Sequence, residues 1–302
     1  MTEYRVLDEE NGMRLDHFLS QRESELSRSA IQKHIKEGDV LVQGKQVKAN
    51  YRVATGEQIS MDIPEPVEVA IVPQNIPLQI LYEDQDILIV DKPKGMVVHP
   101  APGHPDQTLV NAVMYHCKDS LSGINGEIRP GIVHRIDQDT TGSLIICKND
   151  AAHIKIAEQI KVHSIRRIYR GIVIGRVAKD EGVIHAPIGR NPNDRKKMAI
   201  NEKNGKDAIT HYRVLKRYKD YTYMEFQLET GRTHQIRVHM ASIGHPLLGD
   251  MVYGPKKCSY KLQGQTLHAA IIGFVHPSTG EYMEVEAPIP EYFSHLLAIL
   301  PE

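Results

Sequence analysis

Apolar residues at helical spacing predict two short helices near the N-terminus, within residues 13–38. Intervals of three and four residues place side chains on one face of a helix. Ser27 is the expected N-cap of the second helix, and Gly38 is its expected C-terminal end. Two stripes have this spacing: Leu15, Phe18 and Leu19, then Ala30, Ile31 and Ile35.

The next segment, residues 39–61, has short β-branched runs broken by Gly44 and Gly56, which predicts a small antiparallel unit. Together with the helices, it predicts a compact module over residues 1–62. Prolines then crowd a stretch that cannot supply central strands. They predict a stiff linker over residues 63–77, followed by a larger domain over residues 78–302. The prolines are Pro64, Pro66, Pro73 and Pro77.

Strand-like runs dominate the pattern from residue 78 onward. Helical spacing interrupts them at residues 151–165, where Asn149 or Asp150 is the expected cap, and at residues 291–300. Strands outnumber helices without a regular β-α-β alternation, which predicts an α+β fold with a mostly antiparallel sheet. The predicted strands cover residues 80–82, 86–90, 131–133, 144–147, 168–174, 208–215, 221–228, 267–275 and 282–285.

Charge and cysteine content narrow the class of protein. The chain of 302 residues has 37 Lys and Arg against 38 Asp and Glu, so a nucleic-acid partner must bind local basic patches. The 3 cysteines stand far apart in the sequence, which is typical of reduced, cytosolic proteins. The sequence has no apolar leader, and no apolar run reaches the roughly eighteen residues of a membrane span. We therefore expect a soluble, cytoplasmic protein with no membrane partner.

The stretch GIVHRIDQDTTGSLIIC, residues 131–147, places a polar loop between two apolar runs. Catalytic groups are often carried on such loops, and His134, Arg135 and Asp137 are the candidates here. The alternative is an Asx-turn made by Asp137 or Asp139, and from this stretch alone the turn is the favoured interpretation. A protein-kinase loop is excluded, because a residue interrupts the H-R-D motif and the sequence has no D-F-G.

The stretch LETGRTHQIRVHMASIGHPLLGD, residues 228–250, concentrates histidines and arginines. Arg232 and Arg237 each follow a turn-like or strand-like apolar step and could reach an anion, although a solvated basic face is the alternative. His234 and His239 are five positions apart, so they share neither a helix face nor a strand face. Because no acidic residue lies between them, we expect no metal site there.

Two further stretches are basic. KVHSIRRIYRGIVIGRV, residues 161–177, surrounds Tyr169 with Lys and Arg, which suits a surface that contacts phosphates and stacks on a base. Tyr169 could equally belong to the core. GRNPNDRKKMAI, residues 189–200, carries Arg195 and Lys196 in a loop, where they fit either phosphate contacts or solubility.

In their order and combination, these stretches resemble the RluA/RluD-type ribosomal RNA pseudouridine synthases. The resemblance covers nearly the whole chain and includes an N-terminal part similar to the S4-type RNA-binding domain. Ile136 and Thr141 stand where the family usually has leucine and serine, and they preserve size or the hydroxyl. The other matching motifs are YEDQDILIVDKPKGMVVHP, HRIDQDTTG, RRIYRGIV, GRNPNDRKKMA and the histidine-rich stretch.

The resemblance implies an isomerase that converts uridine to pseudouridine in RNA. Large-subunit (23S) ribosomal RNA is the expected substrate, and transfer RNA is the alternative. A catalytic domain with a mostly antiparallel mixed sheet flanked by helices and loops is implied, together with a small N-terminal α/β RNA-binding domain. We expect no cofactor and no metal, and we expect a monomer that acts on free RNA or on a pre-ribosomal particle.

Carried over position by position, the family pattern makes Asp137 the catalytic aspartate and Tyr169 the ring that stacks on the target base. Arg237 is the expected partner that keeps the aspartate charged. Arg135 is expected to enter the RNA where the base has been flipped out. Base flipping costs about a few kcal/mol, which stacking and insertion would offset.

The resemblance also implies RNA contacts outside these four positions. The second helix of the S4-like module would present its basic residues to the RNA backbone, although a merely charged helix face is the alternative. Two other classes of function stay open: an RNA-binding protein that does no chemistry, and a metal-dependent hydrolase built on the histidines. The expected RNA-contacting residues are His134, Arg232, Arg28, Lys33, Lys36, Arg195 and Lys196.

Overall fold

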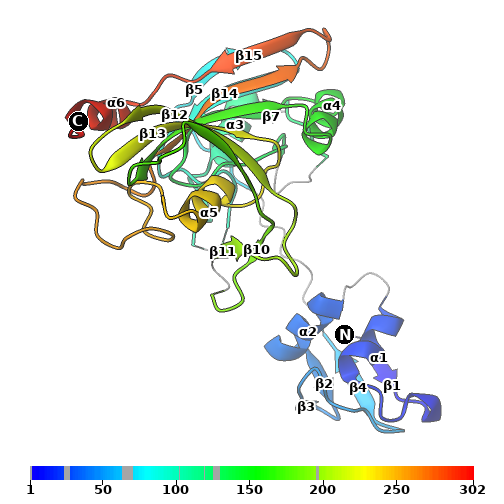
Figure 1. The fold of residues 1–302 in the computed structure, drawn as a ribbon. Helices are drawn as coiled ribbons and strands as arrows, with labels where there is room; N and C mark the ends of the chain where they lie inside the picture. The colour runs from blue at the N-terminus through cyan, green and yellow to red at the C-terminus, as the bar shows by residue number, and fades with distance from the viewer. Residues whose placement is uncertain are drawn as a thin grey trace. The chain divides into compact units, whose positions relative to one another are not determined.

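The computed structural model of the chain contains two compact units, Met1–Val69 and Ala70–Glu302 (Figure 1). The expected helix cap Ser27 and the candidates Arg195 and Lys196 lie outside the described residues. Part of the expected linker also lies outside them, so the domain boundaries drawn from the sequence stay predictions. The described residues are 2–23, 28–62, 71–101, 103–118, 120–124, 130–194 and 197–302.

In the N-terminal unit, two helices pack on a small antiparallel sheet. The helices α1 (Leu15–Arg22) and α2 (Arg28–Glu37) confirm the helical spacing, and Gly38 at φ +95° follows the end of the second helix. Their apolar stripes are buried against Val40 and Ile59 of the sheet. The order of the strands is β1-β4-β2-β3, with β1 at Thr2–Arg5, β2 at Val40–Val42, β3 at Lys45–Gln46 and β4 at Gln58–Met61; a 3-10 turn spans Asp8–Glu10.

A mixed sheet forms the centre of the larger unit. Its described strands follow the order β5-β6-β7-β14-β8-β13-β12-β9, and β15 pairs with β14. All described pairs are antiparallel except β7 with β14, which confirms the predicted α+β fold. The strands are β5 (Gln79–Glu83), β6 (Ile87–Lys92), β7 (Thr141–Cys147), β8 (Arg166–Ile174), β9 (Glu181–His185), β12 (Ile209–Arg217), β13 (Tyr221–Leu228), β14 (Leu267–Val275) and β15 (Tyr282–Glu286), and a separate ribbon pairs β10 (Ile188–Arg190) with β11 (Met198–Ile200).

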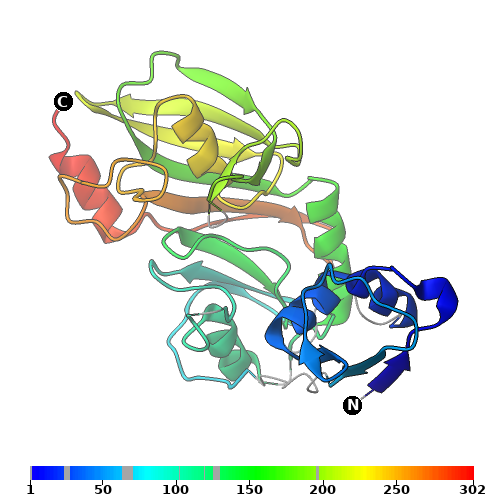
Figure 2. The same ribbon diagram turned by 90° about the horizontal axis from the view of Figure 1, so that it is seen from below.

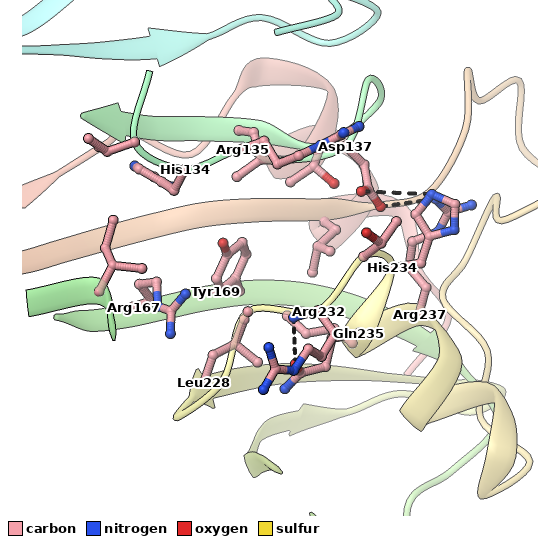
Figure 3. Close-up of a pocket in the computed structure, with 18 of the residues that line it drawn as sticks. His134, Arg135, Asp137, Arg167, Tyr169, Leu228, Arg232, His234, Gln235 and Arg237 are labelled. Carbon is pink, nitrogen blue, oxygen red and sulfur yellow. Dashed lines mark hydrogen bonds and ion pairs between the residues drawn. The ribbon is translucent and has the colours of Figure 1, made fainter. Parts of the chain in front are cut away.

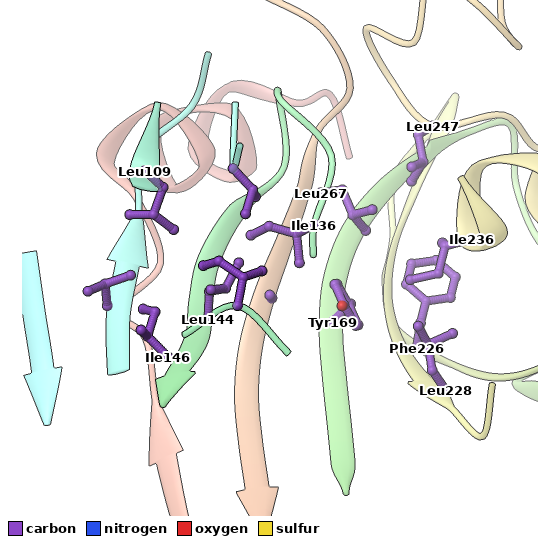
Figure 4. Close-up of a cluster of buried hydrophobic side chains, with 14 of the residues drawn as sticks. Leu109, Ile136, Leu144, Ile146, Tyr169, Phe226, Leu228, Ile236, Leu247 and Leu267 are labelled. Atoms are coloured by element: carbon purple, nitrogen blue, oxygen red, sulfur yellow. The ribbon is translucent and has the colours of Figure 1, made fainter. Parts of the chain in front are cut away.

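Helices cover both faces of this sheet. The main core lies under α3 and α5, which sit over different parts of one face, while α4 and α6 pack on the other face (Figure 2). Alternation along β7 explains the two layers, because Leu144 joins the main core and Ile145 joins the cluster under α4. Figure 4 shows the main core running from Leu109 of α3 past Tyr169 to Ile236 of α5. The helices are α3 (Leu109–Cys117), α4 (Asp150–Lys161), α5 (Gln235–Ser242) and α6 (Glu291–Ile299).

Two expectations about local structure are wrong. Residues 131–133 make only an isolated bridge between Ile132 and Ile146, because Gly131 turns the chain at φ +71° close to the backbone of Cys147. The strand-like step before Arg237 belongs instead to helix α5. Helix α3 and strands β1, β9, β10 and β11 have no counterpart among the predicted elements. Within the described ranges, no helix is long and apolar enough to cross a membrane.

Candidate active site

A cavity of about 890 Å³ opens in the larger unit where three of the singled-out stretches meet (Figure 3). The loop before β7 supplies residues 132–137, and β8 supplies Arg167 and Tyr169. The loop before α5 and the first turn of that helix supply residues 231–237. The structure therefore brings together Asp137, Tyr169 and Arg237, which are far apart in the sequence.

Arg237, in the wall of this cavity, links the carboxylate of Asp137 to a second carboxylate behind it. Its guanidinium donates through Nη1 to Oδ2 of Asp137 at 3.0 Å, and through Nε and Nη2 to Asp250 at 2.7 and 3.0 Å. The paired contacts to Asp250 fix the plane of the guanidinium, because such a fork tolerates little rotation. Burial opposes the charge of Arg237, but hydrogen bonds and the two carboxylates raise its pKa above the ordinary value. The cation is therefore permanent and fixed in direction.

Asp250 is the buried end of this pair. Burial alone would raise its pKa, but hydrogen bonds from Arg237 and from the main-chain N–H groups of Tyr253 and Val252 lower the pKa below the ordinary value. Asp250 thus acts as a permanent counter-charge behind Arg237. It lies in the 228–250 stretch, yet its role depends on the turn that follows α5, which was not among the predicted elements.

The side chain of Asp137 points into the cavity from a tight turn. The turn is closed by main-chain atoms, since the N–H of Thr140 donates to the carbonyl of Asp137 at 3.0 Å. The carboxylate instead meets Arg237, and its Oδ1 lies 3.9 Å from Nε2 of His234. The Asx-turn interpretation is therefore wrong for Asp137. The buried Lys92 holds the turn, because its ammonium donates to the carbonyl of Gln138 at 2.8 Å.

Tyr169 lies in the middle of the cavity, in the central strand β8 (Figure 3). The side chain is 8% exposed and belongs to the main core, so the core interpretation and the cavity interpretation both hold. Burial raises the pKa of its hydroxyl; the charge of Arg167 opposes this and the charge of Asp137 adds to it. The ring is therefore neutral at physiological pH and offers a flat surface for stacking.

Of the RNA-contacting candidates, three line the cavity. His134 accepts the N–H of Ile145 through Nε2 at 3.1 Å, and burial lowers its pKa to about 3, so the ring is neutral and carries its proton on Nδ1. Arg135 is exposed, and its side chain makes no hydrogen bond or ion pair with the rest of the described chain. Arg232 anchors itself by donating through Nε to the carbonyl of Asp207 at 2.8 Å.

The other described candidates lie in the N-terminal unit. Arg28 is partly committed to the structure, because its guanidinium pairs at 3.1 Å with the fully buried Asp16. Nζ of Lys33 lies 3.8 Å from Oε2 of Glu37, one helical turn further along α2. Both side chains are exposed, and such surface ion pairs contribute little to stability. Lys33 and Lys36 also line a hollow of about 740 Å³ beside α2, which Lys48 lines too. This surface of the N-terminal unit is basic.

The histidines of the 228–250 stretch already have other partners. His234 pairs through Nδ1 with the hydroxyl of Tyr253 at 2.7 Å. His239 contacts the hydroxyl of Thr210 and the carbonyl of Ala186, both at 2.9 Å. In the described part of the chain, the groups that could bring three metal ligands together lie elsewhere: His34, Glu37 and Asp39, and Asp84, Asp86 and His276.

Comparison with known proteins gives this cavity its context. The family model described as RNA pseudouridylate synthase matches residues 86–242, and the S4 domain model matches residues 13–59. The chain belongs to the RNA pseudouridylate synthase family. It is an RluA-type RNA pseudouridine synthase, an isomerase, with an N-terminal S4 domain, as the resemblance implied.

Several curated pseudouridine synthases match over nearly their full length. The RNA pseudouridine synthase YlyB of Bacillus subtilis is 51% identical over 290 residues, which cover 96% of this chain and 95% of that protein. The ribosomal large subunit pseudouridine synthase D of Zymomonas mobilis is 46% identical over 310 residues, covering 99% and 98%. The enzyme with the same title from Pseudomonas aeruginosa is 44% identical over 301 residues, covering 96% and 92%.

A solved structure supports the fold of this synthase. Human RNA pseudouridylate synthase domain containing 1 superposes with a TM-score of 0.58 at 24% sequence identity. The match covers 79% of this chain and 99% of the human one. At this identity the likeness concerns the fold alone.

Proposed function

We propose that this synthase converts specific uridines of large-subunit ribosomal RNA to pseudouridine, with Asp137 as the catalytic residue. The observation that carries the assignment of Asp137 is the ion pair from Arg237 to a carboxylate that points into the cavity beside Tyr169. The choice of ribosomal RNA is supported by relatives titled ribosomal large subunit pseudouridine synthase D.

The chemistry fits the three residues. Isomerisation breaks the bond from N1 of uracil to C1′ of ribose, turns the base while it stays bound, and forms a bond from C5 to C1′. The proton on C5 then leaves, and N1 gains one, so no electrons enter or leave. Asp137 would serve as nucleophile toward the sugar or the base, or as the base in a glycal route. Arg237 would hold the carboxylate in position throughout.

Access to the base requires base flipping, because C1′ and C5 cannot be reached in a stacked strand. The neutral ring of Tyr169 lies where an extruded uracil could stack beside Asp137. Arg135 is exposed and without a partner in the described chain, so it is available to fill the gap left in the RNA. Together these contacts would offset an unstacking cost of about a few kcal/mol.

The S4 domain would add affinity rather than selectivity. Its basic hollow beside α2 would contact phosphates, and the linker over residues 63–77 would join it to the catalytic domain at residues 78–302. Two weakly bound surfaces on one chain act through effective concentration, so a monomer suffices. The substrate could be free RNA or an assembling ribosomal particle, and the reaction as written calls for no cofactor.

The test is chemical mapping of pseudouridine in ribosomal and transfer RNA from cells that lack the gene. The deleted strain is complemented with wild type, with Asp137→Asn, or with the control Asp180→Asn, which changes an exposed partner of Arg217. We expect sites in large-subunit RNA to vanish on deletion and to return with wild type and the control only. Restoration by Asp137→Asn would favour a binding protein without chemistry, and sites in transfer RNA alone would overturn the proposed substrate.

A further inference from the structure

One more arginine lines the cavity, at the end away from Asp137. Arg167 stands two positions before Tyr169 on β8, so both side chains lie on the same face of the strand. Figure 3 shows Arg167 and Asp137 at opposite ends of the cavity with Tyr169 between them. The residue is only 8% exposed, and no carboxylate of the described residues pairs with it, which is unusual for a buried arginine.

The guanidinium of Arg167 has only part of its hydrogen-bonding capacity used. Nη2 donates to the carbonyl of Glu229 at 3.0 Å. Nε is buried and has no hydrogen-bond partner in the described part of the chain. Burial lowers the pKa of Arg167, and the nearby charge of Arg232 lowers it further. A buried cation in this position is costly unless an anion joins it.

Two other arginines on β8 each form an ion pair with a glutamate. Arg166 pairs with Glu284 at 2.6 Å, and Arg170 pairs with Glu286 at 3.2 Å. Both neighbours point away from the cavity, because side chains alternate along a strand. Arg167 therefore differs from them in the direction of its side chain and in having no carboxylate partner among the described residues.

The surroundings of Arg167 favour an anion. Gly231 lets the guanidinium pack against the main chain at this end of the cavity, since a Cβ at that position would come within 2.5 Å of Nη1 of Arg167. His134 adds a neutral ring whose Nδ1 carries a proton, because its Nε2 is an acceptor. Among the described residues that line the cavity, Asp137 is the only acidic one and is already paired. The basic residues that line it are Arg135, Lys161, Arg167, Arg232 and Arg237.

We propose that Arg167 binds a phosphodiester of the RNA strand beside the flipped uridine. The inference rests on the proposed function, because it takes RNA as the ligand. With Tyr169 stacked on the base, a phosphate at Arg167 would hold the backbone at a second point. The flipped nucleotide would then be fixed between the two ends of the cavity.

Salt dependence of RNA binding provides the first test, because each phosphate contact on a single strand contributes about 0.7 to the slope of log K against log salt. The probe is a transcript of the RNA segment around a mapped uridine, or an oligouridylate if mapping finds no uridine. Arg167→Gln is expected to lower that slope by about 0.7 and to weaken binding roughly tenfold. The control Arg166→Gln, one residue earlier and facing the other way, is expected to keep the slope. An unchanged slope in folded Arg167→Gln would overturn the proposal.

A second test changes the RNA instead and keeps a positive charge at residue 167. Neutral methylphosphonate linkages are placed one at a time on either side of the uridine. One of these linkages is expected to weaken binding to wild type and to Arg166→Gln by the same factor. It should weaken binding to Arg167→Lys less, because lysine has already lost the forked contact of the guanidinium with the phosphate. Equal losses at every linkage in all three proteins would overturn the phosphate site.

The two proposals fail in different ways. In one case Arg167→Gln lowers the salt slope of RNA binding, but wild type forms no pseudouridine. That result would support the phosphate site and reject the proposed reaction. The opposite result is that pseudouridine forms and requires Asp137, while Arg167→Gln keeps the salt slope of RNA binding and the KM of wild type. That result would reject the phosphate site alone.

Discussion

Nη1 of Arg237 lies 3.0 Å from Oδ2 of Asp137, although 100 positions separate the two residues in the chain. The contact joins the turn before β7 to helix α5, so it exists only when both elements are in place. Asp250 holds Arg237 from the opposite side, and its carboxylate is wholly buried. The position of Asp137 therefore depends on a chain of two ion pairs that begins in the core.

Arg237→Lys tests whether this chain serves the chemical step. Lysine keeps the charge but cannot contact Asp250 and Asp137 at once, so Asp137 loses its fixed partner. We expect kcat to fall about a hundredfold with little change in KM. The rate is measured as release of tritium from C5 of labelled uridine in the RNA identified by mapping. A rise in KM alone would instead make Arg237 a phosphate contact.

Asp250→Asn tests the buried end of the chain. Asparagine keeps the shape but removes the counter-charge of Arg237, and breaking one side of a buried pair costs about 3 kcal/mol. We expect a lower free energy of unfolding in urea and a smaller fall in kcat than in Arg237→Lys. The exposed Asp180→Asn should change neither quantity. Full stability with normal kcat in Asp250→Asn would show that Arg237 is held by other contacts.

A pH-dependent stability is expected from His134. Its folded pKa is about 3 against an ordinary value of 6.5, because burial disfavours the charged ring. Between these values the unfolded chain binds more protons than the folded one, so stability falls as the pH is lowered from 6.5 toward 3. Above pH 6.5 the group makes no contribution to the pH dependence.

His134→Gln isolates this effect, because the amide oxygen can still accept the N–H of Ile145 but does not titrate. The free energy of unfolding is measured across this pH range for both proteins. We expect the curve of wild type to be steeper, with a difference on the order of a few kcal/mol between its two ends. Parallel curves would mean that the ring is not buried in neutral form.

The fold could be predicted from sequence where a strand alternates cleanly or runs apolar without a break. Residues 221–228 alternate between buried and more exposed positions, residues 267–275 are almost continuously apolar, and both are strands with the predicted bounds. Helix α5 could not be found, because polar and apolar residues alternate along Gln235–Met240 as in a strand, and all six side chains are buried, so no helical period is visible. The run at 131–133 has the composition of a strand, yet Gly131 turns the chain at φ +71° and leaves only the bridge between Ile132 and Ile146.

The site could be predicted only in part, for a related reason. Asp137, Tyr169 and Arg237 each sit in a motif whose local sequence allows a turn, a core position or a basic face. Their combination pointed to one family, and the structure places them in one cavity. Asp250 and Arg167 were missed because their surroundings are tertiary. Asp250 holds Arg237 from beyond α5, and Arg167 is distinguished by having no carboxylate partner in the part of the chain that the structure describes.

Gly142 provides a further test of how the Asp137 turn is held. It lies in β7 at φ +111°, and a Cβ there would collide with the main-chain oxygen of Ala269 on β14. Gly142→Ala therefore adds a clash to the strain of a left-handed residue. We expect the free energy of unfolding to fall by more than about 2 kcal/mol. In protein that still folds, displacement of the turn should lower kcat more than RNA affinity.

Gly280→Ala separates the two causes, because Gly280 has φ +74° but a Cβ there would meet nothing within 4 Å. Its loss of stability should reflect backbone strain alone, about 1 kcal/mol. The excess loss in Gly142→Ala then measures how firmly β7 and β14 are pressed together beside the Asp137 turn. Equal losses in the two variants would mean that the strands yield at this point, and that Lys92 rather than sheet packing holds Asp137 in place.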